Sequence, residues 1–131
     1  MGDYDLTRFG PWYGDRDSSI RETIKSVKRL KNVPAGIWLT SHEDGIFKEK
    51  PGAKWEQYLS IIDEREKKLV DLLQSPQTLD DIIDAWIIYG RPREPKVFFK
   101  FGERVHMKKH LEKLMNEGRV VRDGKYYVVS Q

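Results

Sequence analysis

One apolar stripe stands out in the first third of the chain. Its members recur at three- and four-residue spacing, at Ile20, Ile24, Val27 and Leu30. This spacing predicts an amphipathic helix with one face turned toward a core. Asp17 or Ser18 can cap its start, and the sequence Asn-Val-Pro at residues 32–34 ends it.

Strand-like runs flank this helix. Residues 2–6 read as the end of a strand, and side-chain alternation places Asp3 and Asp5 on one side of it. The apolar run at residues 37–39 (Ile-Trp-Leu) is typical of a buried strand, and a polar loop containing His42 follows it directly. The order strand, helix, strand predicts parallel neighbours joined by a right-handed crossover. Asp3 and His42 would then lie at the same edge of the sheet.

The pattern changes after residue 50. Apolar positions at helical spacing predict helices over residues 55–73, 78–87 and 104–117. Thr78 and Asp81 have the spacing of a capping box at the start of the second helix. The dipeptide Asp-Gly at residues 123–124 stands between two β-prone runs, which predicts a β-hairpin near the end of the chain.

Composition places the chain among ordinary folded proteins. It has 131 residues, of which 34% are charged and 38% apolar, which suits one domain or two small ones with a modest core. No apolar run approaches the roughly 20 residues of a membrane span, so no membrane partner is expected. The absence of cysteine excludes disulfides and thiolate metal sites. Together with the lack of a secretory signal pattern, it favours a cytoplasmic location.

Charge is distributed unevenly along the sequence. Residues 91–131 carry 11 Lys and Arg against 5 Asp and Glu, whereas residues 1–90 carry 13 against 16. Such a split indicates two parts with different surroundings.

Two motifs in the first part together resemble a known family. The segment GDYDLTRFGPWYGD at residues 2–15, then a helix, then IWLTSHEDG at residues 37–45, resembles the C-terminal half of metallo-β-lactamase-fold hydrolases. In that family an Asp after one strand bridges two metal ions, and a His after a later strand binds one of them. The resemblance, which covers residues 1–55, implies that Asp3 is the bridging carboxylate and His42 the last His ligand. Asp5 is the alternative bridging residue if the register differs by two.

The chain departs from that family in its histidines. The family's His-x-His-x-Asp-His loop is absent, and the only histidines are His42, His106 and His110. A catalytic zinc site takes about three protein ligands and an open position for water, so Asp3 and His42 leave it incomplete. We therefore expect a fragment, either cut from a hydrolase or encoded by a gene that lost its first half. The resemblance implies zinc or another divalent metal pair in the intact protein; no metal and no catalysis are expected in this chain alone.

The second part resembles a winged helix domain. Three helices and a hairpin, with the cadence xLxxLxxEGRVxxxxGxYxV, carry this resemblance over residues 56–131. The same group of metallo-hydrolases often has such a domain at its C-terminus. The expected fold class is therefore α+β, a truncated metallo-β-lactamase strand-helix-strand layer followed by a winged helix-turn-helix domain. The helix from residue 55 would run from one part into the other. The alternative is a stand-alone winged-helix module that binds DNA, RNA or a protein partner.

Basic residues cluster where a winged helix would contact nucleic acid. The third helix and the hairpin carry Arg104, Lys108, Lys109, Lys113, Arg119, Arg122 and Lys125. Attraction to phosphates rather than base reading is the expected mechanism. The other interpretation is a solvated helix face, because three glutamates dilute the patch. His106 and His110, four residues apart, could form a metal pair, but HMKKH lacks the Glu of a hydrolytic motif, and we expect both exposed or half-packed.

The first part also predicts self-association. Two strands and one helix leave an unpaired strand edge and apolar side chains that need cover, namely Phe9, Trp12, Tyr13 and Trp38. A second copy of the chain would supply that cover, so a homo-oligomer is expected, in addition to the missing N-terminal half of the hydrolase as a partner. The alternative is a monomer in which the helix from residue 55 folds back over this face.

Overall fold

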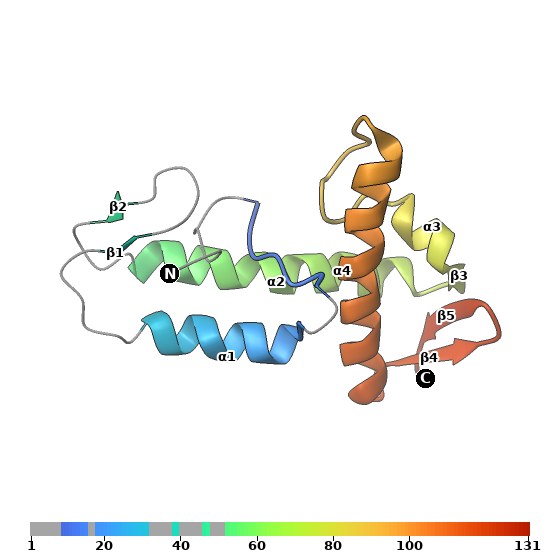
Figure 1. Ribbon diagram of the computed structural model, residues 1–131. Helices are drawn as coiled ribbons and strands as arrows, with labels where there is room; N and C mark the ends of the chain where they lie inside the picture. Colours follow the sequence, from blue (N-terminus) through green and yellow to red (C-terminus); the bar gives the residue numbers. More distant parts are fainter. Residues whose placement is uncertain (1–8, 16–17, 32–37, 40–45, 48–51) are drawn as a thin grey trace. The chain divides into compact units, whose positions relative to one another are not determined.

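A computed structural model describes residues 9–15, 18–31, 38–39, 46–47 and 52–131 of the chain (Figure 1). These residues form four helices and five short strands. The elements, in order, are α1 (Ile20–Lys31), β1 (Trp38–Leu39), β2 (Ile46–Phe47), α2 (Gly52–Leu72), β3 (Gln77–Thr78), α3 (Leu79–Ile83), α4 (Lys96–Asn116), β4 (Val120–Asp123) and β5 (Tyr126–Val129). The chain divides into two compact units, one of residues 1–13 and 17–63 and one of residues 14–16 and 64–131.

Helix α1 confirms the apolar stripe predicted for the first unit. Val27 packs with Trp55 and Tyr58 of α2 in one buried cluster. The start of the helix differs in detail, because the hydroxyl of Ser19, rather than Asp17 or Ser18, accepts the backbone N–H of Glu22 at 3.2 Å. The start of α2 thus covers the apolar face of α1 within the unit.

Tyr13 belongs to a second cluster of the same unit. It is fully buried with Ile20 and Ile62, and Ile24 packs against them. The expectation that this side chain needs cover from a second copy is wrong, because α1 and α2 already enclose it. Phe9 and Trp12 stay exposed by 38% and 39%.

Strand β1 confirms the apolar run predicted as a strand, and its described partner is β2. The two strands pair antiparallel, with Trp38 opposite Phe47 and Leu39 opposite Ile46. Sequence reasoning missed β2 because two apolar residues are too short to show a period. The expected parallel neighbour around Asp3 lies outside the described residues.

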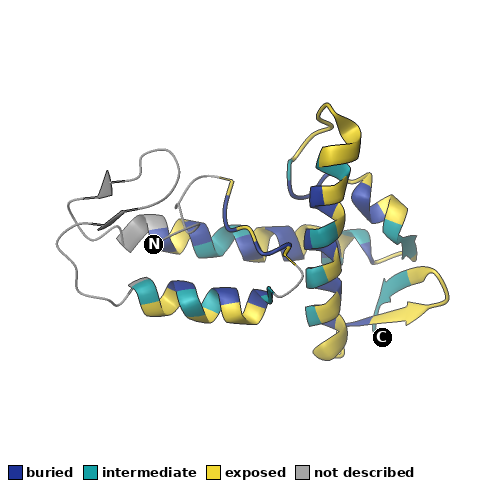
Figure 2. Cartoon of the chain, viewed as in Figure 1, coloured by how far each residue is buried: buried dark blue, intermediate teal, exposed yellow. Residues whose placement is uncertain are grey.

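The second unit builds its core from α2, α4 and a three-stranded sheet. The strand order is β3-β5-β4, with both pairs antiparallel, and Thr78 lies opposite Tyr126. Figure 2 shows the buried faces of the helices. The core side chains are Leu69, Leu73, Ile82, Ile87, Ile88, Met107, Leu111, Leu114 and Val120. Among the described helices, none is long and apolar enough to cross a membrane.

Helix α3 begins as predicted but ends early. Its N-terminal capping box is reciprocal: the Thr78 hydroxyl accepts the N–H of Asp81 at 3.1 Å, and the Asp81 carboxylate accepts the N–H of Thr78 at 3.0 Å. The prediction of helix up to residue 87 is wrong. After Ile83 the chain turns, and Trp86 takes a left-handed conformation with φ of 53°. Ile87 still reaches the core, from a turn rather than a helix.

Helix α4 is longer than the sequence pattern predicts. It begins at Lys96 instead of Arg104 and ends at Asn116. Its first two turns carry apolar side chains that are exposed, such as Val97 and Phe101. No inward stripe marks these turns, which explains why periodicity missed them.

The predicted hairpin is present as β4 and β5, with a turn one residue later than Asp-Gly implies. Asp123 pairs with Tyr126, so Gly124 and Lys125 form the two-residue turn. Gly124 has φ of 61°, a value that L side chains rarely adopt. Glycine at the first turn position is typical of type II′ hairpin turns.

The capping box makes a testable contribution to stability. Replacing Thr78 by Ala removes the acceptor for the Asp81 N–H, and we expect the free energy of unfolding to fall by about 1 kcal/mol. Urea denaturation followed by circular dichroism measures this change. Asp80→Ala alters the same turn but leaves both capping bonds in place, so its effect should stay within about 0.5 kcal/mol. Equal losses in the two variants would contradict a specific role for the cap.

Candidate functional site

The predicted metal edge falls outside the part of the chain that can be described. Asp3, its alternative Asp5, and His42 are not among the described residues. Within the described ranges, no group of three or more His, Asp or Glu side chains is placed to hold a metal ion. The candidate site among the described residues is therefore the set of basic side chains on α4 and the hairpin of the second unit.

Four of the predicted cations are exposed on two neighbouring elements. Arg104 and Lys108 lie one turn apart on α4, while Arg122 and Lys125 belong to the hairpin. Lys109 is half-buried on the same helix. Elements β4 and α4 contact one another, so the structure brings these charges into one unit.

Aromatic rings hold the hairpin cations in place. The guanidinium carbon of Arg122 lies 5.6 Å from the ring centre of Tyr127, and its Nε donates to the Gly124 carbonyl at 2.9 Å. The ammonium of Lys125 lies 5.4 Å from the ring centre of Tyr126. Such contacts restrict the side chains without neutralising them, so both remain able to meet a phosphate.

Lys113 forms an ion pair with the carboxylate of Glu66. Its ammonium donates to both oxygens of Glu66 at 3.0 Å and lies 3.3 Å from Glu117. Arg119 also approaches Glu66, at 3.8 Å, although it is half exposed. Of the predicted contact residues, Lys113 therefore has the least charge to offer a ligand. Sequence reasoning missed the pair because 47 residues separate its partners.

Glu66 sits at the centre of a buried polar cluster. The Nδ1 atom of His110, a residue with no exposed surface, lies 3.6 Å from the Glu66 carboxylate. Burial raises the pKa of Glu66, but the nearby His110 imidazole and the two bonds and positive charge of Lys113 outweigh it and leave the pKa below its usual value. Burial also lowers the pKa of His110 despite the carboxylate beside it. The imidazole is therefore neutral at neutral pH.

His106 is buried one turn earlier on the same helix. Its Nδ1 lies 2.8 Å from the carbonyl oxygen of Gly102. Because a carbonyl only accepts, Nδ1 must carry the proton. Burial lowers the pKa of this side chain from 6.5 to about 4. The expectation that His106 and His110 are exposed or half-packed is wrong, because both lie on the inner face of α4 and are buried. The two lysines between them in HMKKH gave no indication of a buried face.

Glu103 is a third buried ionisable group on that face. Its carboxylate accepts the N–H groups of Ile88 and Tyr89 at 3.0 and 2.8 Å. Burial raises its pKa, although these two bonds and the charge of Arg65 act in the opposite direction. The side chain thereby fixes the segment after α3 to α4, which is a structural rather than a catalytic use of a carboxylate.

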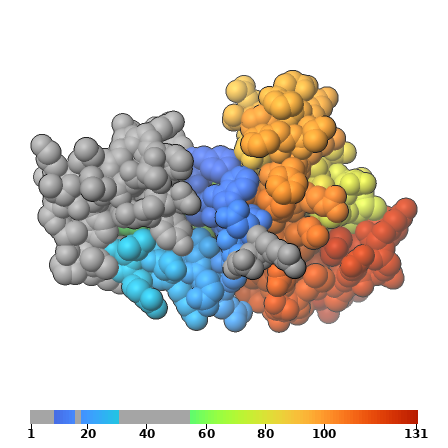
Figure 3. All heavy atoms as spheres, in the orientation of Figure 1, coloured from blue at the N-terminus to red at the C-terminus, as the bar shows by residue number. Residues whose placement is uncertain are grey.

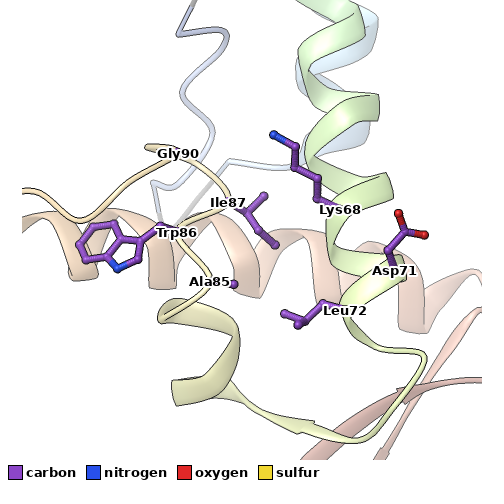
Figure 4. Close-up of a pocket in the computed structure, with 7 residues that line it drawn as sticks. All are labelled: Lys68, Asp71, Leu72, Ala85, Trp86, Ile87 and Gly90. Carbon is purple, nitrogen blue, oxygen red and sulfur yellow. The ribbon is translucent and has the colours of Figure 1, made fainter.

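Two concavities lie in the second unit. One, of about 450 Å³, is lined by residues of α2 and of the segment after α3, namely Lys68, Asp71, Leu72, Ala85, Trp86, Ile87 and Gly90 (Figure 4). The other, of about 580 Å³, lies between α3 and α4 and includes Arg104. The first has apolar walls with Lys68 and Asp71 on the same helix.

The buried imidazole makes a testable contribution to the pH dependence of stability. The folded-state pKa of His106 is depressed, so its contribution is present above about pH 6.5 and is lost as the pH falls toward 4. We expect the free energy of unfolding to fall over this range, with about 3 kcal/mol due to His106. Urea titrations at several pH values should show a shallower dependence in His106→Gln. Glu103 has a raised pKa and acts in the opposite sense, but it is present in both proteins and cancels in the difference. Parallel pH curves would contradict the assignment.

Two solved structures share the fold of this chain. A metallo-β-lactamase family protein from Thermus thermophilus matches 98% of this chain and 40% of its own, with a TM-score of 0.75 and 24% sequence identity. A β-lactamase domain protein from Burkholderia ambifaria matches 82% of this chain and 32% of its own, with a TM-score of 0.63 and 19% identity. No family model and no curated protein matches the sequence. The chain spans less than half of either structural neighbour, and it has the fold of one part of a metallo-β-lactamase family protein.

Proposed function

We propose that this chain is the C-terminal portion of a metal-dependent hydrolase of the metallo-β-lactamase superfamily. The observation that carries the proposal is one structural match that runs over 98% of this chain but 40% of a metallo-β-lactamase family protein. A match of that extent includes both units, so the second unit is also part of the shared fold. The motifs at residues 2–15 and 37–45 point to the same family independently.

The second unit is proposed to be a winged helix domain. Its order is the end of α2, then β3, α3, α4 and the β4–β5 hairpin, and the short first strand pairs with the last. In a winged helix the third helix and the hairpin are the elements that contact a ligand. The order of elements and the strand pairing support this assignment.

The chain is proposed to be inactive alone. Asp3 and His42 supply one carboxylate and one imidazole, fewer donors than the three that a catalytic zinc site takes from the protein. The proposed activity of the intact protein is metal-dependent hydrolysis of an ester, thioester or phosphodiester bond. The bound metal would supply a hydroxide nucleophile at neutral pH. This chain would contribute the carboxylate of Asp3 and the imidazole of His42 as metal ligands.

Metal stoichiometry tests the fragment proposal. The chain alone should retain well under one zinc per molecule after dialysis, measured by plasma mass spectrometry, because two ligands without further support hold the ion weakly. A protein extended by the coding sequence upstream of the Met1 codon should retain zinc. It should lose metal on Asp3→Ala or His42→Ala, whereas Asp63→Ala is the control on an exposed helical carboxylate.

Two results would contradict this proposal. One is stoichiometric zinc in the chain alone that is lost on His42→Ala, since the site would then be sufficient by itself. The other is an upstream sequence with no His-x-His-x-Asp-His loop and no zinc in the extended protein. In that case the stand-alone module becomes the better description.

A stand-alone winged-helix module is the second candidate, for binding nucleic acid or a protein partner. The observation that favours nucleic acid is the group of exposed cations on α4 and the hairpin, two of them held over tyrosine rings. Their contacts would be to phosphates, so affinity would depend strongly on salt and little on sequence.

Charge reversal tests this binding. Replacing Lys108, Lys109 and Arg122 by Glu should weaken binding of a labelled DNA duplex by at least about tenfold. It should also reduce the slope of log affinity against log salt by about 3, one unit for each phosphate contact. The matched control reverses three cations of α1, Arg21, Lys25 and Arg29, and so changes the net charge equally. Fluorescence anisotropy over a salt series gives both quantities, and equal losses in the two triple variants would show that only net charge matters.

A further inference from the structure

An exposed apolar ridge lies on the first two turns of α4. Val97, Phe98 and Phe101 are exposed by 87%, 64% and 61%. Val97 and Phe101 are one turn apart on the helix and share a face. Figure 2 shows this end of α4 as exposed, and Figure 3 shows its side chains standing at the surface in orange. Single exposed apolar residues are normal, but three within five positions indicate a surface that another molecule covers.

The ridge is held in shape by contacts between aromatic rings and by a hydrogen bond behind them. The ring of Phe98 meets that of Phe99 edge-on at 5.2 Å, and Phe99 meets Tyr89 in the same manner at 5.0 Å. The Tyr89 backbone is in turn bonded to the buried Glu103. An ordered apolar surface loses little conformational entropy on binding, so the ridge is preorganised for an interaction.

A hollow lies directly beside the ridge. The pocket of about 580 Å³ is walled by Val97 and Phe101 on α4 and by Ile83 on α3. Apolar side chains therefore form both a projection and a recess on one surface, which we call the α3–α4 face.

The charges around the hollow are balanced. Asp80 belongs to α3 and Asp84 follows its last residue, while Lys100 and Arg104 come from α4. Lys100 lies 3.1 Å from Asp84 within the chain. A nucleic acid or an acidic peptide placed in the hollow would meet the two carboxylates as well as the cations. A surface that carries both signs is complementary to a rotated copy of itself.

We propose that the α3–α4 face pairs with the same face of a second copy of this chain, in a two-fold homodimer. The exposed ring of Phe98 enters the hollow of the partner, and Asp80 and Asp84 of one copy face Lys100 and Arg104 of the other. Phe98 and Phe101 alone offer about 250 Å² of apolar surface per copy. This is close to a third of the roughly 800 Å² that each partner contributes to a standard interface.

This dimer is distinct from the association expected through Trp38. All of its residues belong to the second unit. It is also independent of the hydrolase proposal, because it requires no metal ligand.

Sedimentation velocity of the full chain at micromolar concentration is the first test. We expect a species of about twice the 15.5 kDa monomer mass. Phe98→Glu should raise the dimer Kd by about 30-fold or more, as the loss of a central aromatic anchor does. Val121→Glu is the matched control, because Val121 is a 47% exposed apolar residue on the hairpin of the same unit. Circular dichroism should show both variants folded.

Charge exchange provides a second test that needs no apolar substitution. One variant carries Asp80→Lys with Asp84→Lys, and the other carries Lys100→Glu with Arg104→Glu. Each should be monomeric alone, because like charges then face one another in both halves of the pair. An equimolar mixture should form a heterodimer, since every facing pair is again of opposite sign.

Three outcomes would overturn the proposal. A parent chain that stays monomeric on concentration removes the dimer itself. A dimer that persists in Phe98→Glu uses another face. A monomer that binds a labelled single-stranded oligonucleotide, and loses it in Phe98→Glu, assigns the ridge to base stacking instead. The zinc measurements on the extended protein are unaffected by any of these results, so the two proposals fail separately.

Discussion

The buried carboxylate of Glu66 ties together three elements of the second unit. From α2 it receives two bonds from Lys113 of α4 and lies close to His110, while Arg119 approaches it from the start of the hairpin. The Lys113 pair is partly exposed, so removing one partner leaves the other charge only partly compensated by solvent. Together with the apolar core, this cluster joins α4 to α2 and holds the turn that precedes the hairpin.

A consequence is that α4 has two faces with different roles. Its inner face carries ionisable side chains, Glu103, His106 and His110, and each has a defined use inside the unit. Two of them are neutral imidazoles, which avoids the cost of placing charge in the core. Its outer face carries the exposed cations and the apolar ridge, the groups on which the two binding proposals rest.

Periodicity in the sequence was sufficient wherever an apolar stripe faced a core. It located α1, α2 and the inner part of α4, and local turn chemistry located the capping box of α3 and the hairpin. It failed at the first turns of α4, where Val97 and Phe98 face outward, and beyond Ile83, where Trp86 leaves the helix while Ile87 keeps a core position. At Ile87 the apolar pattern predicted burial correctly but predicted the wrong backbone conformation.

The sequence predicted which basic residues belong to the candidate site, but it did not predict which of them are paired with carboxylates. The sequence indicated the cations of α4 and the hairpin, because their number and position are local properties. It did not indicate that Lys113 is matched by Glu66, since that contact joins residues far apart in the chain. The burial of His106 was missed for a related reason. Which face of a helix is buried depends on the elements that pack against it, and these are distant in the sequence.

Helix α2 crosses the boundary between the two units without a break, changing unit between Asp63 and Glu64. Separate units are usually joined by an exposed flexible segment, where proteases cut and recombination is tolerated. Here the same boundary is a run of helical hydrogen bonds, and interrupting it would cost each side its first or last turns. A proteolytic cut within α2 is therefore expected to require local unfolding of this helix first, whereas a cut in an exposed flexible linker would not.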